Sequence, residues 1–221
     1  MFERLAAIHT GALTDVLFEL GYGSQTLPCE IGGLRPGMRL AGAAFPLESR
    51  PGPPPQEYDE TSRAWEMFES VPAGHVAVYA TGGGEHAVIG DLAIALLKAR
   101  GCTGVVVDGG CRDIELILAI GLPVFCRFTT PLDISHGRGE VVGWGNPVDV
   151  GEVRVSRGDV VVADSDGVVV IPAALAQRVL GTAEDLVERE ARIRAALLEG
   201  LSPDQAYTRN PTRPPRRLDP S

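Results

Sequence analysis

The chain has 221 residues, of which 44% are hydrophobic, and this is enough to build a core without disulfides or structural metals. Its formal net charge of −9 argues against non-specific binding to nucleic acid or to an anionic membrane. The apolar runs are far shorter than a membrane span, and the N-terminus, which carries Glu3, lacks the apolar stretch of a secretion signal. We therefore expect a cytoplasmic protein with no nucleic-acid or membrane partner.

The first part of the chain predicts helices and strands separated by clear breakers. Apolar residues at helical spacing predict an amphipathic helix over 1–21, which Thr10 is expected to cap and Gly21 to end. The elements expected next are a strand over 39–47, an exposed Pro-rich loop over 49–55, a helix over 58–70 and a strand over 75–79.

A glycine-rich stretch follows, in which Gly82, Gly84 and Ala87 fit the pattern G-x-G-x-x-A. With Asp108 about twenty residues further on, this spacing is typical of a dinucleotide-binding loop. The next helix, however, is expected to begin only at Gly90. We therefore favour glycines that let the backbone approach a small ligand, with Glu85 and His86 at the mouth of the pocket.

The stretch from Gly90 onward predicts a helix, a buried strand, a turn and a second helix. The first helix is expected over 90–100, and Gly101 ends it. The β-branched run 105–107 predicts a strand that is covered on both faces, and 108–110 are expected to form a turn. Arg112 and Asp113 would then lie at the start of the next helix.

This arrangement predicts an anion site beside a metal ligand. An arginine such as Arg112 can hold a carboxylate through two hydrogen bonds, and the N-termini of helices attract anions. Asp113 can offer oxygen to Mg²⁺, which usually keeps several waters. Together they could stabilise an enolate. The alternative is structural: Asp113 caps the second helix and Arg112 forms a surface ion pair.

The second half of the chain predicts a short helix, a strand and then a series of short strands. The expected elements up to the last helix lie over 114–120, 123–127, 141–144, 148–150, 153–155, 160–163 and 168–171. His136 and Arg138 lie in a polar loop and could contact a substrate or a neighbouring subunit. Asp164–Gly167 predicts a hairpin turn. A helix over 174–198 completes a single domain over 1–202, and 203–221 is expected to be an Arg- and Pro-rich tail.

Reactive side chains are few. The four cysteines form no C-x-x-C pair and are expected to be reduced, although Cys111 beside Arg112 could be a reactive thiol. Lys98, the only lysine, lies near the end of a predicted helix, which argues against a lysine-imine aldolase.

Several stretches carry a family resemblance. G-D-L at 90–92 and G-x-x-G-V-V-V-D-G-x-x-R-D at 101–113 resemble motifs of the 4-hydroxy-4-methyl-2-oxoglutarate aldolases, which share a family with the "regulator of ribonuclease activity A" proteins. The segments at 9–17, 34–37, 40–44 and 158–172 are also similar to this family, so the resemblance covers about residues 8–200. It implies an α/β fold of the β/β/α swivelling-domain type, with a central β-sandwich or barrel flanked by helices.

The resemblance also implies roles for individual residues. Arg112 would bind the pyruvate part of the substrate, and Asp113 would hold Mg²⁺ or Mn²⁺ with waters. Asp91 would act in catalysis near that arginine. The backbone N–H groups of Gly90, Asp91, Leu92, Ala93 and their neighbour Ile94 would bind the substrate carboxylate. A glutamate from the last helix of a neighbouring subunit, Glu190 or else Glu188, would approach the metal waters, so the resemblance implies homotrimers or homohexamers.

Three functions are compatible with these patterns. The first is a divalent-metal-dependent aldolase that cleaves a 4-hydroxy-2-oxo acid to pyruvate and a carbonyl compound, with oxaloacetate decarboxylation as a side activity. The second is a non-catalytic regulator that binds a ribonuclease or another protein. The regulator branch tends to lack the carboxylate after the arginine, and the presence of Asp113 therefore favours the enzyme. The third is a nucleotide-dependent enzyme that uses the loop 82–87.

Overall fold

The computed structural model describes residues 1–53, 60–135 and 138–211. Its helices are α1 (Phe2–Ala7), α2 (Thr10–Glu19), α3 (Glu60–Glu69), α4 (Asp91–Ala99), α5 (Ile114–Ile120), α6 (Ala176–Leu198), preceded by a 3₁₀ turn at Ala173–Leu175, and α7 (Pro203–Arg209). Its strands are β1 (Gly32–Gly33), β2 (Leu40–Pro51), β3 (His75–Ala80), β4 (Ala87–Ile89), β5 (Gly104–Cys111), β6 (Val124–Thr129), β7 (Gly139–Trp144), β8 (Val148–Val150), β9 (Val153–Val155), β10 (Val160–Asp164) and β11 (Gly167–Ile171).

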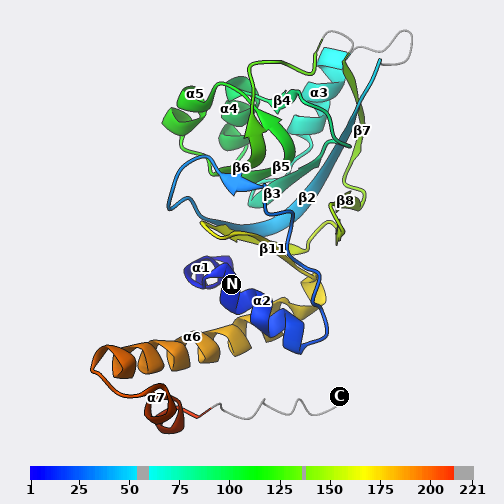
Figure 1. Ribbon diagram of the computed structural model, residues 1–221. Coiled ribbons are helices and arrows are strands. Elements are labelled where there is room, and N and C mark those ends of the chain that lie inside the picture. The colour runs from blue at the N-terminus through cyan, green and yellow to red at the C-terminus, as the bar shows by residue number, and fades with distance from the viewer. Residues whose placement is uncertain (54–59, 136–137, 212–221) are drawn as a thin grey trace.

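One strongly curved sheet organises the molecule. Its strand order is β1-β6-β5-β3-β2-β10-β11, with β4 paired to β5 and β7 paired to β2. The neighbours β2, β3, β5 and β6 run parallel, whereas β1, β7, β10 and β11 join antiparallel. The long strand β2 pairs with β10 through its first residues and with β7 through its last, so the sheet curls into a nearly closed barrel (Figure 1).

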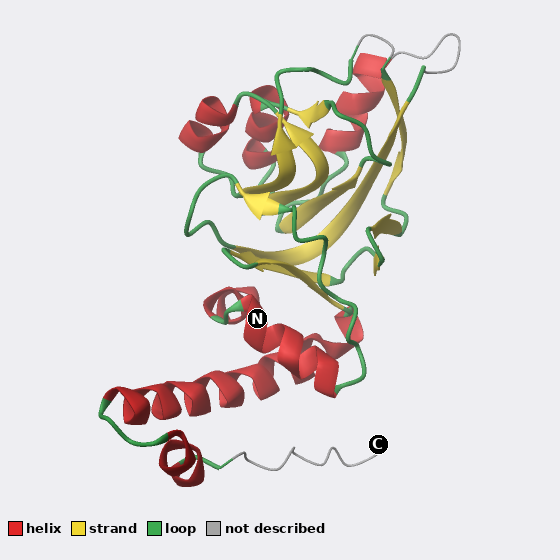
Figure 2. Ribbon diagram, viewed as in Figure 1, coloured by secondary structure: helices red, strands yellow, loops and turns green. Residues whose placement is uncertain are grey.

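The alternation of side chains along the strands separates three apolar clusters. Val105 and Val107 of β5 point into a cluster beneath α3, α4 and α5, whereas Val106 points into the barrel interior with Phe125. On β10, Val161 joins the barrel interior and Val160 joins a third cluster, which α1, α2 and α6 cover. Helices therefore cover both ends of the barrel, as Figure 2 shows, and the expected fold class is confirmed.

The N-terminal segment differs from the single helix expected over 1–21. It forms two helices, α1 and α2, and the chain is extended at Ile8 and His9 between them. The cap of α2 is His9, whose Nδ1 accepts a hydrogen bond from the N–H of Ala12 at 3.1 Å, and not Thr10. Thr10 instead donates from its N–H and its hydroxyl to the carboxylate of Asp164, at 2.9 and 2.7 Å.

Asp164 ends β10 at the predicted hairpin, which the structure confirms. Burial alone would raise the pKa of Asp164. Hydrogen bonds from Thr10 and Asp166 and the charge of Arg39 outweigh this effect, and they lower the pKa below its usual value. The carboxylate therefore joins α2 to the sheet most strongly in its ionised form.

This depressed pKa predicts a pH-dependent stability. The contribution of Asp164 is fully present above the pKa of the unfolded carboxyl group and is lost as the pH falls through the lower pKa of the folded state. We expect Asp164→Asn to lower the free energy of unfolding by about 2 kcal/mol at pH 7 and to flatten its decline in acid. Urea unfolding from pH 7 to pH 3 measures both effects. The exposed Asp149→Asn is the control, and an equal acid decline in both variants would contradict the prediction.

The strand β5 is longer than expected, because the predicted turn at 108–110 is instead extended backbone that continues to Cys111. A Cβ atom on Gly109 would lie 2.8 Å from the Thr81 side chain, and one on Gly110 would lie 2.6 Å from the Phe128 ring. These glycines therefore permit close packing in the sheet. Their effect is to carry the strand up to Arg112.

The C-terminal part is dominated by α6, which extends away from the barrel (Figure 1). The segment assigned to a tail over 203–221 contains α7, which Ser202 and Gln205 cap reciprocally and which packs on α6. Residues 212–221 lie outside the described part. No helix in the described ranges is long and apolar enough to cross a membrane.

Candidate active site

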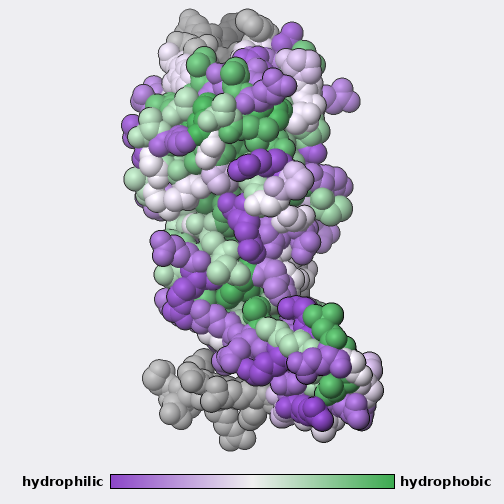
Figure 3. Space-filling model, turned by 90° about the vertical axis from the view of Figure 1, so that its left-hand side faces the viewer, coloured by the Kyte–Doolittle hydropathy of each residue, from purple (hydrophilic) through white to green (hydrophobic). Residues whose placement is uncertain are grey.

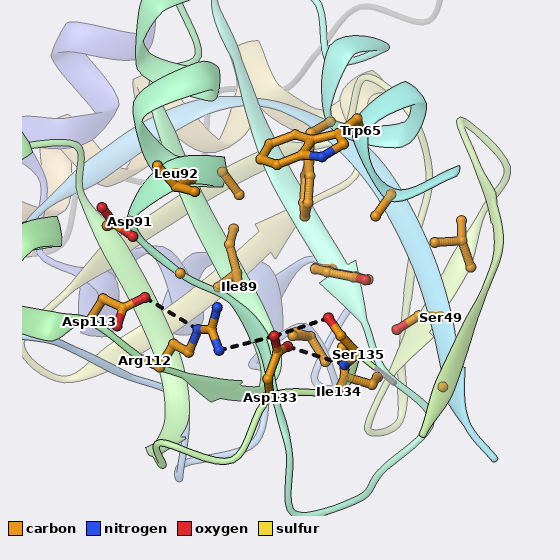
Figure 4. Close-up of a pocket in the computed structure, with 18 of the residues that line it drawn as sticks. Ser49, Trp65, Ile89, Asp91, Leu92, Arg112, Asp113, Asp133, Ile134 and Ser135 are labelled. Atoms are coloured by element: carbon orange, nitrogen blue, oxygen red, sulfur yellow. Dashed lines mark hydrogen bonds and ion pairs between the residues drawn. The ribbon is translucent and has the colours of Figure 1, made fainter. Parts of the chain in front are cut away.

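A pocket of about 170 Å³ lies between α3, the start of α4 and the segment after β5. Arg112 and Asp113 lie on one side of it, Ser49 lies on the other, and Trp65 covers the space between them (Figure 4). Helix α4 begins at Asp91 as predicted. The pocket therefore brings together the predicted residues Gly90, Asp91, Leu92, Ala93, Arg112 and Asp113.

Arg112 is held between two carboxylates. Its Nε lies 3.3 Å from Oδ2 of Asp113, and its Nη1 lies 3.0 Å from Oδ2 of Asp133. Its side chain is 39% exposed, which leaves part of the guanidinium facing the pocket. A guanidinium has five N–H donors, so both ion pairs leave donors for an acidic ligand.

Asp113 has an unusual backbone conformation, and its carboxylate lies beside Arg112. It is the one residue other than glycine with a positive φ in the described ranges, at φ 59° and ψ 39°. It is the N-cap residue of α5, as the structural alternative predicts, but its side chain makes no cap hydrogen bond. The carboxylate of Asp113 is therefore not used to cap α5, and it lies beside Arg112 at the pocket. Backbone strain of this kind clusters at functional sites.

Gly90 makes room for that carboxylate. A Cβ atom built on Gly90 would lie 2.5 Å from Oδ2 of Asp113 and 3.2 Å from Nε of Arg112. Because the φ of Gly90 is −135°, space and not backbone freedom requires glycine here. Gly90 is also the N-cap of α4 and offers no side-chain acceptor to the helix. The first N–H groups of α4 therefore stay available to a ligand in the pocket.

The loop after β6 contributes residues that the sequence did not reveal. Asp133 binds Arg112, and its carboxylate also accepts hydrogen bonds from the N–H and hydroxyl of Ser135, at 3.2 and 3.0 Å. The loop is fixed because Ile134 donates to the carbonyl of Ala87 at 3.0 Å. This pairing with β4 is long-range, and the sequence carries no local signal for it. Arg138 donates to carbonyls of this loop, and His136 lies outside the described residues.

The remaining wall of the pocket is mostly apolar. Trp65 and Phe68 of α3 both line the pocket. Ser49 and Glu140, from β2 and β7, also line it and were not predicted. Ser49 belongs to a segment expected to be a loop, but β2 continues through it because β7 pairs with it.

Glu190 and Glu188 lie far from this pocket within one chain. Both are on α6, and this helix lies at the end of the molecule opposite to α4 and α5 (Figure 1). Glu190 lies 3.6 Å from Nε2 of His9, and Glu188 accepts a hydrogen bond from Arg192 at 2.6 Å. Neither glutamate can act at the Arg112 site of its own chain.

The dinucleotide alternative does not fit the fold. Gly82 and Gly84 lie in a loop with positive φ, and the strand β4 separates this loop from α4. A dinucleotide loop would lead directly into the helix. Asp108, the acidic residue of that pattern, is paired with Arg127. Glu85 and His86 do not line the pocket that Arg112 faces.

The thiol of Cys111 is not suited to nucleophilic chemistry. It is fully buried, and its hydrogen bond with Cys126 together with burial raises its pKa well above the usual value. Cys111 therefore belongs to the core beneath α4 and α5, and the reactive-thiol hypothesis is not supported.

Comparison with known proteins agrees with this fold. The family model described as "RraA-like: Aldolase/RraA" matches residues 10–170, and the chain therefore belongs to the RraA-like family. A protein of Halalkalibacterium halodurans, named as a candidate 4-hydroxy-4-methyl-2-oxoglutarate aldolase, is 37% identical over 131 residues, which are 58% of this chain and 61% of that protein. Protein DlpA of Legionella pneumophila is 28% identical over 93% of this chain and 33% of its own length.

The match therefore spans less than two thirds of either relative. Solved structures match more completely. Streptomyces coelicolor RraAS2, described as an unusual member of the RNase ES inhibitor RraA family, is 31% identical with a TM-score of 0.76, over 87% of this chain and 96% of that one. An uncharacterised protein of Pseudomonas syringae is 28% identical with a TM-score of 0.80, over 93% and 95%.

Proposed function

We propose that this protein is a divalent-metal-dependent aldolase that cleaves a 4-hydroxy-2-oxo acid to pyruvate and a carbonyl compound. The observation that carries the proposal is the pairing of Arg112 with Asp113 at the uncapped N-terminus of α4, facing one pocket. Candidate aldolases among the relatives agree with it. Oxaloacetate decarboxylation would use the same enolate chemistry and is proposed as a side activity.

The residues at the pocket fit Mg²⁺ or Mn²⁺. The described residues contain no group of three or more His, Cys, Asp or Glu side chains that could enclose a metal. Mg²⁺ does not need such a group, since it commonly binds through one or two carboxylates and keeps its waters. Asp113 supplies such a carboxylate, and Gly90 leaves the space beside it open. When bound, the cation would draw electrons from the 2-oxo group of the substrate.

The residues of the chain would act as follows. Arg112 and the N–H groups of Asp91, Leu92 and Ala93 hold the carboxylate and the 2-oxo oxygen. The C4 hydroxyl loses its proton to a water held by Asp91. The C3–C4 bond breaks, its electron pair moves to C3, and C4 becomes the carbonyl carbon of the leaving product. Arg112 stabilises the pyruvate enolate, and water then protonates C3 to give pyruvate.

A complete site would also use a second subunit. Glu190 lies on a helix that extends away from the barrel, where it could reach the pocket of a neighbouring chain. Leu92 on α4 and Leu116 on α5 are 67% and 56% exposed, and Figure 3 shows apolar surface on the side that carries these helices. We propose a homotrimer or homohexamer in which these surfaces meet, with Glu188 as the second choice for the contributed glutamate.

The test of the function is the release of pyruvate from 4-hydroxy-2-oxo acids and from oxaloacetate, with Mg²⁺ and with EDTA. Lactate dehydrogenase and NADH follow the product. Turnover that requires the metal is the expected result. Absence of turnover on every substrate would contradict the proposal and favour a protein that binds a ribonuclease or another partner, as described for structural relatives.

The close approach at Gly90 predicts a large effect of a small change. In Gly90→Ala the new methyl group displaces the carboxylate of Asp113, and we expect kcat/KM to fall about 10²-fold, because small misplacements at a reacting centre have effects of this size. Gly143→Ala is the matched control, since a Cβ atom there meets nothing within 4 Å. Equal activity of the two variants would show that the Gly90 contact is unimportant.

A further inference from the structure

The charges that line the pocket are strongly unbalanced. Arg112 is the single cation among its described lining residues, whereas the carboxylates are those of Asp91, Asp113, Asp133 and Glu140. Four negative charges and one positive charge leave −3. Only Arg112 can neutralise the carboxylate of a bound acid from within the lining, and it already contacts two carboxylates.

Neighbouring cations in the described part of the same chain do not correct this balance. Arg50 pairs with Glu140 but lies outside the lining, with a side chain that is 67% exposed, and counting it changes the sum only to −2. The guanidinium of Arg138 donates to the backbone carbonyls of Asp133 and Ser135, at 2.9 and 3.3 Å. The undescribed segments next to the lining in sequence, 54–59 and 136–137, contain no Lys or Arg.

The side of the pocket away from Arg112 is largely apolar, and its charged group is the carboxylate of Glu140. Trp65, Phe68 and Val141 form its wall. Ser49 lies across the pocket from Arg112 (Figure 4), is 2% exposed, and its hydroxyl has no hydrogen-bond partner within the described part of the chain. A buried hydroxyl without a partner is costly, and a ligand would satisfy it.

We infer that the part of the substrate that leaves as the carbonyl product is uncharged and largely apolar. This inference rests on the proposed function, because it takes Arg112 as the residue that binds the 2-oxo acid end. Within one chain and with a divalent cation bound, Arg112, Arg50 and the cation supply +4, and the four lining carboxylates and the C1 carboxylate of the substrate supply −5. The glutamate proposed to come from a second subunit would add one more negative charge. A second substrate carboxylate would enter a largely apolar and already negative space, whose described lining in one chain offers no further cation to pair with it.

The size and the polar group of the pocket define this substrate class further. At about 170 Å³ the pocket is smaller than the roughly 300 Å³ and above that drug-sized ligands occupy, so a short substituent fits. The Ser49 hydroxyl can donate to or accept from a neutral hydroxyl or carbonyl of the substrate, whereas one donor cannot satisfy a carboxylate. The geometry thus favours 4-hydroxy-2-oxopentanoate and related alkyl compounds over 4-hydroxy-2-oxoglutarate, its 4-methyl derivative and oxaloacetate.

A binding experiment tests this preference separately from catalysis. The matched ligands 2-oxopentanoate and 2-oxoglutarate differ only by a methyl group and a carboxylate at C5, and both are titrated calorimetrically into the full chain with Mg²⁺. We expect 2-oxopentanoate to bind at least about tenfold more tightly, the size of effect that one unfavourable charge contact produces. Equal or tighter binding of 2-oxoglutarate, or no binding of 2-oxopentanoate, would overturn the inference.

The variant Glu140→Gln tests the charge argument directly. It removes one carboxylate at nearly constant volume and frees Arg50, so the preference for 2-oxopentanoate should shrink about tenfold. Glu152→Gln, on the exposed turn between β8 and β9, is the control and should leave the preference unchanged. An unchanged preference in Glu140→Gln would contradict the charge argument.

Pyruvate release from 4-hydroxy-2-oxopentanoate and from 4-hydroxy-2-oxoglutarate separates the aldolase proposal from the inference about the leaving part. No release from either compound would remove the aldolase proposal, whereas faster release from 4-hydroxy-2-oxoglutarate would remove only the inference about the leaving part.

Discussion

Replacing Arg112 by alanine is expected to lower kcat/KM for pyruvate release about 10³-fold. The loss of one preorganised donor to a developing oxyanion commonly costs about 10² to 10³, and Arg112 supplies a full positive charge as well. Arg112→Lys keeps the charge but loses the planar pair of donors, so its activity should lie between those of wild type and Arg112→Ala. Initial rates over a range of substrate concentrations give kcat and KM for each variant.

The control for Arg112 is Arg154→Ala. Arg154 pairs with Asp149 on the β8–β9 hairpin, away from the pocket, and its side chain is 58% exposed. We expect less than a twofold change in kcat/KM, since an exposed ion pair contributes little. A folded Arg112→Ala protein that kept more than about a tenth of the wild-type rate would rule out this arginine as the enolate-stabilising group.

Phe125→Ala is expected to have the largest effect on stability. Phe125 is fully buried in the barrel interior, and its ring packs so closely that a Cβ atom on Gly33 would lie 3.2 Å from it. Removal of a buried phenylalanine ring costs about 3–5 kcal/mol, because the transfer free energy is lost and a cavity remains. Equilibrium unfolding in guanidinium chloride measures the difference.

The matched control for Phe125 lies on the surface. Leu116 on α5 is 56% exposed in one chain, and Leu116→Ala should change the free energy of unfolding of the monomer by less than about 0.5 kcal/mol. A loss below 1 kcal/mol in Phe125→Ala would mean that the barrel interior repacks, contrary to a close-packed core. Unfolding must be compared at a protein concentration where both variants have the same oligomeric state.

The sequence predicted the part of the site that local patterns encode. Apolar spacing and Gly101 defined α4 to within one residue at each end, and the β-branched run at 105–107 defined the start of β5. These elements place Arg112 and Asp113 beside the N-terminus of α4, as predicted. Such features are local, because helix periodicity and end signals depend on residues a few positions apart.

The predictions from the sequence were wrong where contacts with distant residues override local preferences. Gly109 and Gly110 indicated a turn, but they are extended because Thr81 and Phe128 pack against them. The first helix is interrupted at His9, and Asp164, 154 residues away, binds the N–H of Thr10. Asp133 was missed for the same reason, since its loop is positioned by pairing with β4.

The most direct test of the account compares wild type with Asp113→Ala, each with Mg²⁺ and with EDTA, for pyruvate release from 4-hydroxy-2-oxopentanoate and 4-hydroxy-4-methyl-2-oxoglutarate. Wild type is expected to release pyruvate only with the metal, and Asp113→Ala is expected to be inactive in both conditions. Turnover that survives both EDTA and the loss of Asp113 would contradict the metal-dependent mechanism at this site.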